Sequence, residues 1–155
     1  MIRHAATEAD IMKTVQKILL ILALLFWCTG FVQAAESFQT TSRGAQYKDL
    51  KPGTGEPADV GDIVTIHFIN WLENNGVQGK EIYNTRKDNK TVSFVVGTDK
   101  VMPGWNEGVI GMKQGGRRLL KLPPALGYGA KGVPGVVPAN ARLIFVIDLI
   151  GLEKQ

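Results

Sequence analysis

Apolar and polar residues alternate in several short runs along the chain, which is typical of β-strands with one buried face. The alternation is clearest in IVTIHFINWL, residues 63–72, and in TVSFVV, residues 91–96. Shorter runs of the same kind occur around residues 47–50 and at RRLLKL, residues 117–122. Because each run is short and has one polar side, the pattern predicts an antiparallel sheet with one face on the core.

Two further apolar patterns complete this prediction. The run RLIFVIDLIGL, residues 142–152, is apolar on both faces apart from Asp148, which predicts a central, buried strand. Trp105, Val109 and Met112 are spaced as i, i+4 and i+7, one face of a helix of about two turns. A helix this short is not stable alone, so it must pack on the sheet. We therefore expect an α+β fold with about five short antiparallel strands and one short helix.

The segments between these runs differ in character. Residues 73–90, ENNGVQGKEIYNTRKDNK, are polar and predict a long excursion between strands. GTGEP (53–57) and GVIGMKQGG (108–116) are rich in glycine and predict turns. Residues 123–141, PPALGYGAKGVPGVVPANA, form a long connection that prolines stiffen and whose glycines let the backbone approach a ligand. A loop of this length in a compact domain is usually functional.

The N-terminus resembles a secretory signal. Lys13 and Lys17 precede an apolar run, and small residues ending at Ala34 follow it as a cleavage site, so we expect residues 1–34 to be removed. Translation starting at Met12 would give the conventional opening MKTVQK. The alternative is a membrane anchor, but the apolar run of roughly a dozen residues is shorter than the roughly 20 that span a bilayer. The expected location is periplasmic or secreted, with no membrane-spanning segment in the mature form.

Cleavage at Ala34 would leave a polar, flexible leader over residues 35–44 and a folded domain over residues 45–155. Lipidation at Cys28 is disfavoured by the bulky Trp27 before it, and the mature chain then contains no cysteine. The net charge of +4 would fall to +3, because residues 1–34 carry three basic and two acidic residues. This excess is mild and has no basic, aromatic-interleaved stretch, so we expect no nucleic-acid partner.

The mature chain offers little conventional catalytic chemistry. Its one histidine, His67, alternates with apolar residues in a strand pattern, which indicates a structural role. No Cys–His set, G-x-S-x-G motif or phosphate loop is present, so we expect no metal and no cofactor. Aromatic and apolar residues instead surround a glycine-rich helix start and a stiff loop, a combination that suits a concave apolar site.

Three segments together resemble the FKBP-type peptidyl-prolyl cis-trans isomerases. They are VTIHFINWLENNG (64–76), VMPGWNEGVIGMKQGGRR (101–118) and LGYGAKGVPGVVPANARLIF (126–145), and the resemblance extends over Gly44–Glu153. The segment that precedes these motifs is similar to the corresponding segment of secreted bacterial members; it comprises residues 41–62, TSRGAQYKDLKPGTGEPADVGD. The resemblance implies an antiparallel half-barrel of five or six strands wrapped on one short α-helix.

The resemblance also implies a function and a set of site residues. The expected activity is rotation of X-Pro bonds in proline-containing polypeptides, assisting the folding of exported proteins. Around the proline pocket the resemblance places Trp105 at the floor, Val101, Met102 and Phe145 as lining, and Val133 and Val137 on the loop side. The Tyr128 hydroxyl and the Met102 backbone N–H would donate hydrogen bonds to substrate carbonyls.

One wall of this pocket, expected to bind substrate through Phe68, Ile82 and Tyr83, departs from the family pattern. The family usually has Phe-Asp at positions 82–83, tyrosine at position 68 and often arginine at position 88, and these polar residues form a cluster. Here Phe68, Tyr83 and Asp88 stand instead. A tyrosine at position 68 would have no carboxylate at position 83 to accept its hydrogen bond. A phenylalanine at position 68 is therefore consistent with the presence of Tyr83.

Two functions remain compatible with the sequence. Desolvation of the substrate amide needs no nucleophile, so the altered wall is compatible with an active isomerase. The alternative is a non-enzymatic polypeptide-binding or chaperone module with a weakened site. Macrolide inhibitors of the family contact this wall, so we expect their affinity to be altered.

Overall fold

The computed structural model describes residue 12, residues 16–17 and residues 37–155. The predicted signal segment, residues 1–34, lies outside the described residues apart from three positions, and its cleavage stays a prediction. Residues Glu36–Gln155 form one compact unit. In the described part of the chain, no helix has the length and apolar character needed to cross a lipid bilayer.

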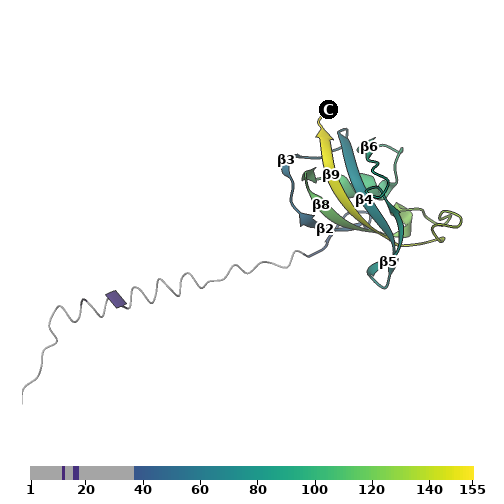
Figure 1. Cartoon of the computed structure of the whole chain (residues 1–155), viewed down its shortest axis with the longest axis horizontal. Coiled ribbons are helices and arrows are strands. Elements are labelled where there is room, and N and C mark those ends of the chain that lie inside the picture. The colour runs from purple at the N-terminus through teal and green to yellow at the C-terminus, as the bar shows by residue number, and fades with distance from the viewer. Residues whose placement is uncertain (1–11, 13–15, 18–36) are drawn as a thin grey trace, which may run out of the picture. The chain divides into compact units, whose positions relative to one another are not determined.

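The main sheet has seven antiparallel strands in the order β1-β2-β8-β9-β4-β5, and β6 pairs with the part of β4 that β5 leaves free. Its strands are β1 (Gln39–Thr40), β2 (Gln46–Lys51), β4 (Ile63–Asn74), β5 (Val77–Asn84), β6 (Val92–Val95), β8 (Arg117–Leu122) and β9 (Leu143–Glu153). Strands β2, β8, β9 and β4 run side by side in Figure 1.

Strand β9 is central, as its apolar pattern predicts. It pairs with β8 on one side and with β4 on the other over ten registered positions, including Asn70 with Phe145. Residues 143–147 are all buried, whereas Asp148 is half-buried and forms ion pairs with Arg86 at 2.9 Å and Arg117 at 3.5 Å. The one polar residue of the run is therefore neutralised by two arginines.

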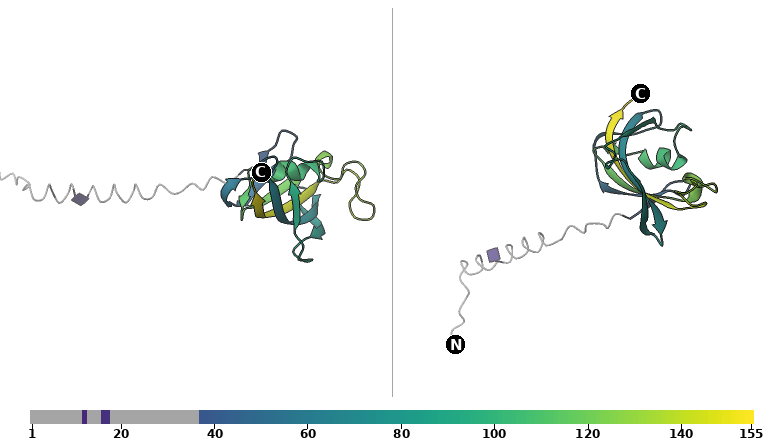
Figure 2. Two further views of the ribbon diagram at one scale, coloured as in Figure 1. Left: turned by 90° about the horizontal axis from the view of Figure 1, so that it is seen from above. Right: turned by 45° about the vertical axis from the view of Figure 1, so that its right-hand side comes forward.

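Helix α2 (Pro103–Val109) lies on the concave side of the curved sheet, where Figure 2 (right) shows it as a green ribbon. Two glycines let it approach β8 closely. A Cβ atom at Gly104 would lie 2.4 Å from Leu122, and one at Gly108 would lie 2.4 Å from Leu120. Trp105 and Val109 are buried in the core, which confirms the packing face for these two residues. Met112 is buried too, but it lies beyond the helix, which ends at Val109. The α+β half-barrel expected from the sequence is confirmed.

The sequence predicts a long excursion between strands over residues 73–90, but this segment contains strand β5. β5 pairs with β4 through a hairpin whose turn residues Asn75 and Gly76 both have positive φ, 49° and 84°. Asn-Gly with positive φ at both positions is typical of a type I′ hairpin turn. β5 lies at the sheet edge, so it needs no apolar alternation, and for this reason the sequence pattern missed it.

Two other segments differ from expectation. The turns predicted at 53–57 and 108–116 supply β3 (Thr54–Pro57) and β7 (Lys113–Gln114), which pair as a second, two-stranded sheet. A short 3₁₀ helix, η1 (Pro124–Leu126), follows β8.

The expectation of a flexible leader over residues 35–44 is corrected for residues 39–44. β1 pairs with β2, and the turn after it is closed by a bond from the Thr41 N–H to the Ala45 carbonyl, 2.8 Å. The Thr41 hydroxyl also donates to Glu107 of helix α2, and Arg43 lies 3.4 Å from the same carboxylate. Polar contacts with the helix order this segment without any apolar pattern.

Candidate functional site

The site begins at the N-terminal end of helix α2. Met102 precedes the helix, and Pro103 takes the first helical position, where its missing N–H costs nothing. The Asn106 side chain then fixes the preceding loop by accepting from the Gly97 N–H at 2.8 Å and donating to the Thr98 carbonyl at 2.6 Å. This anchoring sets the position of Trp105 relative to the sheet.

Five aromatic rings from five elements converge here. We call them the aromatic cluster: Phe68 (β4), Tyr83 (β5), Phe94 (β6), Trp105 (α2) and Phe145 (β9). The Trp105 ring centroid lies 4.8 Å from Phe68 in an edge arrangement, 5.7 Å from Phe94 in a stacked one, and 6.0 Å from Phe145. The Phe68 ring lies 5.9 Å from Phe145 and 5.7 Å from Tyr83. Such pairs hold the rings in specific orientations.

The residues predicted for the site divide into a buried floor and a more exposed rim. Phe68, Trp105, Phe145 and Val137 belong to the buried core. The half-buried residues that pack against this core are Ile82, Val101, Met102, Tyr128 and Val133, and Tyr83 is 40% exposed. Nine of the ten predicted residues thus belong to, or pack against, one hydrophobic core, and Tyr83 joins them through its contact with the Phe68 ring.

Three hydrogen-bond donors at this end of the helix have no protein partner. Within residues 37–155, nothing accepts a hydrogen bond from the Met102 N–H or the Tyr128 hydroxyl. The Trp105 Nε1–H is buried and also without a partner. Buried donors are nearly always paired in folded proteins, so a group of free donors beside apolar rings is a feature expected of a binding site.

Burial also fixes the protonation state of Tyr128. Partial desolvation raises the pKa of its hydroxyl above the ordinary value of 10.0, because the phenolate is less well solvated than the phenol. The Tyr128 hydroxyl therefore stays protonated, and able to donate, throughout the neutral and mildly alkaline range.

The loop after η1 carries Tyr128 and is internally hydrogen-bonded. Val133 and Val137 exchange two backbone hydrogen bonds of 2.8 Å each, and the Gly132 N–H donates to the Tyr128 carbonyl at 3.1 Å. Gly132 has φ +60°, and a Cβ there would lie 2.3 Å from the Val137 carbonyl oxygen. Only glycine fits at position 132, where the tip of the loop closes.

In the wall that departs from the family pattern, Tyr83 interacts with a polar residue. Interaction with the Asp88 carboxylate raises the pKa of the Tyr83 hydroxyl, and desolvation adds to this. Thr85 is fully buried and ties the wall to β4: its hydroxyl donates to the Phe68 carbonyl at 3.0 Å and accepts from the Phe68 N–H at 2.8 Å. His67 contacts the same hydroxyl at 3.0 Å, in keeping with a structural role.

Sequence reasoning placed Phe94 in a strand but not in the site. Its ring stacks on Trp105 with an interplanar angle of 29°. The alternation in residues 91–96 already pointed its side chain inward, so the signal was present. The pairing of Tyr83 with Asp88 carried no comparable signal, because it depends on the path of the loop between them.

At the opposite end of helix α2 a buried arginine, Arg118, is fully engaged by hydrogen bonds. Arg118 is 3% exposed and donates to both Asp49 oxygens, at 2.6 and 3.0 Å, and to the Gly108 and Ile110 carbonyls, each at 2.9 Å. Its guanidinium carbon lies 4.2 Å from the Tyr47 ring centroid. A buried arginine thus satisfies the last carbonyls of the helix.

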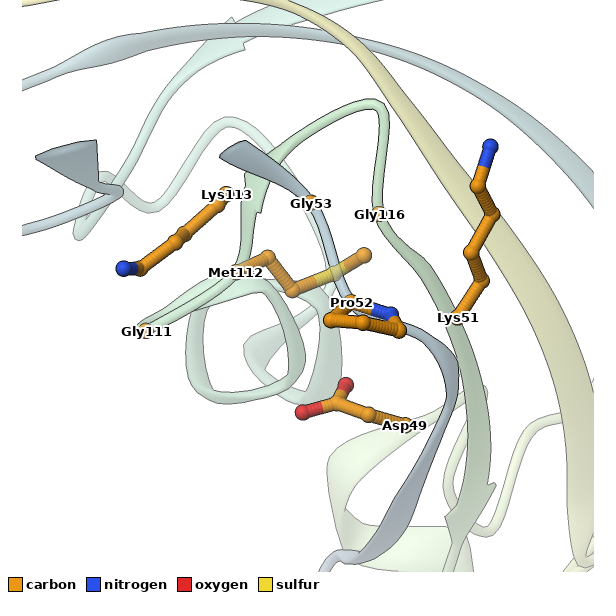
Figure 3. A pocket seen from close by; sticks show the side chains of 8 residues that line it. All are labelled: Asp49, Lys51, Pro52, Gly53, Gly111, Met112, Lys113 and Gly116. Carbon is orange, nitrogen blue, oxygen red and sulfur yellow. The ribbon is translucent and has the colours of Figure 1, made fainter. Parts of the chain in front are cut away.

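A cavity of about 150 Å³ lies beside this end (Figure 3). Its lining residues are Asp49, Lys51, Pro52, Gly53, Gly111, Met112, Lys113 and Gly116. None of the predicted site residues lines it. In Figure 3 the side chains of Lys51 and Lys113 extend away from each other to opposite sides.

Comparison with known proteins decides the family. Residues 54–150 match the family described as FKBP-type peptidyl-prolyl cis-trans isomerase. The chain belongs to this family. Among the described residues, no group of three or more His, Cys, Asp or Glu side chains could hold a metal ion.

The isomerase is similar over most of its folded part to curated relatives. An FK506-binding protein of Neisseria meningitidis serogroup A / serotype 4A is 39% identical over 103 residues, which are 66% of this chain and 91% of the relative. Peptidyl-prolyl cis-trans isomerase FKBP1A of Xenopus laevis is 38% identical over 111 residues, 71% of this chain and 99% of the relative.

Solved structures of related isomerases have the same fold. The crystal structure of FkpA from Escherichia coli matches with a TM-score of 0.66 and 26% identity, covering 97% of this chain and 75% of that one. AtFKBP13 matches with a TM-score of 0.66 and 29% identity, covering 74% of this chain and 98% of that one.

Proposed function

We propose that the isomerase accelerates X-Pro rotation by holding the proline ring against the aromatic cluster and removing water from the amide. Amide resonance opposes this rotation with a barrier of roughly 20 kcal/mol. The planar amide is more charge-separated than the twisted transition state, so an apolar surface favours the twist. No nucleophile is required.

The free donors at the start of helix α2 are the observation that supports this proposal. The Tyr128 hydroxyl and the Met102 N–H have no partner among residues 37–155, and both residues are half-buried and pack against the core that contains Trp105. We assign them to substrate carbonyls, which they would orient so that the proline ring lies on Trp105. Orientation and desolvation then act together on one bond.

The direct test is isomerisation of a short X-Pro peptide by the full chain, compared with Trp105→Leu. This substitution keeps the floor apolar but removes the indole, and we expect kcat/KM to fall by at least about tenfold. A second variant, Phe68→Tyr with Tyr83→Asp, restores the usual family wall. If the unmodified chain is folded but inactive, and activity appears only in this double variant, the function is polypeptide binding rather than catalysis.

The N-terminal signal anatomy supports a role in folding exported proteins after cleavage near Ala34. We expect a cell that produces the full chain to release a form beginning at Ala35 into its periplasm or medium, identified by mass spectrometry of the N-terminal peptide. Recovery of only the uncleaved chain inside the cell would contradict this location.

We also propose that FK506-type macrolides bind, since curated relatives bear the name FK506-binding protein. The wall that Phe68 and Tyr83 form differs from the usual family pattern, so affinity should be lower than for the variant with Phe68→Tyr and Tyr83→Asp. Competition between the macrolide and an X-Pro peptide measures both affinities in one assay.

A further inference from the structure

A second, larger cavity of about 430 Å³ lies between the β4–β5 hairpin and the loop that follows Tyr128. Its lining residues are Leu72, Lys80, Lys131, Val133, Pro134, Gly135, Val136, Val137, Pro138 and Ala139. This volume is within the range of about 300–1,000 Å³ that is common for ligand sites. We call it the loop–hairpin cavity.

The loop–hairpin cavity is walled in part by the hydrophobic core that contains the aromatic cluster. Val137 is 4% exposed and belongs to the same buried core as Trp105, while Val133 packs against that core. Both valines also line the cavity, and their two mutual hydrogen bonds of 2.8 Å fix their positions. A polypeptide with its proline on Trp105 would therefore place neighbouring residues along this wall.

The charge of the cavity is one-sided. Its charged lining residues are Lys80 and Lys131, both exposed, and no carboxylate lines it. Within residues 37–155 neither lysine takes part in an ion pair. The carboxylates beside the hairpin are already used, since Glu81 pairs with Lys87 at 2.7 Å and Glu73 with Arg142 at 2.9 Å.

Lys80 lies near the start of β5, in the hairpin that β5 forms with β4. It therefore supplies a cationic edge to the cavity that the valines and prolines of the loop also line.

We propose that the loop–hairpin cavity binds the substrate residues that flank the proline and selects an acidic side chain among them, through Lys80 and Lys131. The proposal rests on the proposed isomerase function and adds a substrate class to it. Apolar contacts with the loop would hold the chain, and the two ammonium groups would attract the carboxylate.

The test uses the full chain and pairs of peptides that contain one X-Pro bond and differ only by Glu or Gln at one position. The position is moved from three residues before the proline to three residues after it. At low salt we expect kcat/KM for the Glu peptide to be about two- to fivefold higher at one or more positions, as for other exposed ion pairs. The preference should shrink toward 0.5 M salt.

Variants assign the preference to the cavity. Lys80→Gln with Lys131→Gln should abolish it, and Lys80→Glu with Lys131→Glu should reverse it. The matched control is Lys51→Gln with Lys113→Gln, which changes the net charge equally at two exposed lysines of the cavity in Figure 3 and should leave the preference intact.

Three outcomes overturn the proposal: equal turnover of Glu and Gln peptides, a preference that survives Lys80→Gln with Lys131→Gln, or a preference that the control variant also loses. Turnover of the Gln peptides shows separately that the isomerase function holds. If no peptide is turned over, the proposed function fails, and fluorescence anisotropy with the same labelled peptides still shows whether Glu is preferred in binding.

Discussion

The two ends of helix α2 differ in how their polar groups are satisfied. At the C-terminal end, Arg118 is buried and donates four hydrogen bonds to Asp49, Gly108 and Ile110. At the N-terminal end, the Met102 N–H and the Trp105 Nε1–H have no partner among residues 37–155. The helix between these ends is only seven residues long.

We infer that one end of this short helix stabilises the fold and that the other end binds the substrate. Leaving a buried donor unpaired costs about 1–3 kcal/mol, so a fold tolerates it mainly where a ligand completes the bond. The satisfied end should therefore determine stability, and the unsatisfied end should determine activity. The predictions below test this separation.

The largest expected effect is on stability at the satisfied end. Arg118→Ala leaves the helix carbonyls unpaired, and we expect the free energy of unfolding to fall by about 3 kcal/mol; the fall is limited because Asp49 stays partly in contact with water. Below the melting transition, kcat/KM per folded molecule should be unchanged.

Arg117→Ala is the matched control for Arg118→Ala. The Arg117 side chain is 42% exposed and lies 3.5 Å from Asp148, so the loss should stay below about 0.5 kcal/mol in urea unfolding. Equal losses for both variants would contradict the role assigned to Arg118.

The next effect is on activity at the unsatisfied end. Tyr128→Phe removes one donor and little volume, so we expect kcat/KM to fall about three- to tenfold while stability changes by less than about 0.5 kcal/mol. The hydroxyl has no protein partner among residues 37–155, so its removal leaves no orphaned group in the fold. A large stability loss with full activity would reverse the assignment.

A smaller effect is expected at the altered wall. Tyr83 is 40% exposed, and its hydroxyl is engaged by Asp88. Tyr83→Phe should change kcat/KM by less than about twofold, because the floor rather than the wall supplies desolvation. Peptide isomerisation measured beside Tyr128→Phe shows which hydroxyl matters, and a larger loss from Tyr83→Phe would move the donor role to the wall.

The smallest effect is on pH dependence. Burial raises the pKa of Tyr128 above 10.0, so the stability linked to its neutral hydroxyl is fully present below pH 10 and is lost as pH rises through the higher folded value. We expect flat kcat/KM from about pH 6 to 9, and a decline in unfolding free energy above pH 10 that is shallower in Tyr128→Phe. A drop in activity below pH 9 would contradict a neutral donor.

The parts of the fold that could be predicted are those whose residues carry an apolar pattern. Strand β9 is a nearly continuous apolar run, the face of α2 with Trp105 has a helical apolar period, and both patterns are confirmed. The edge strand β5 lacks one and was missed, although its Asn-Gly turn was visible in the sequence. Short β3 and β7 are set by the close approach of Gly53 to Lys113, a contact between distant segments.

The candidate site shows the same division. The region around Trp105 followed from the family resemblance and the spacing of apolar residues. The free donors, the interaction of Tyr83 with Asp88, and the Arg118 contacts depend on side-chain positions that three-dimensional packing alone decides. None of them has a local signature in the sequence.

The most direct test of the central claim is a nuclear magnetic resonance titration of the ¹⁵N-labelled chain with a short X-Pro peptide. The account predicts that the Trp105 indole N–H and the Met102 amide shift and broaden while cis and trans prolines exchange, with the Gly111 and Gly116 amides unchanged. Perturbation confined to Gly111 and Gly116, with exchange still catalysed, would contradict it and move the site to the other end of helix α2.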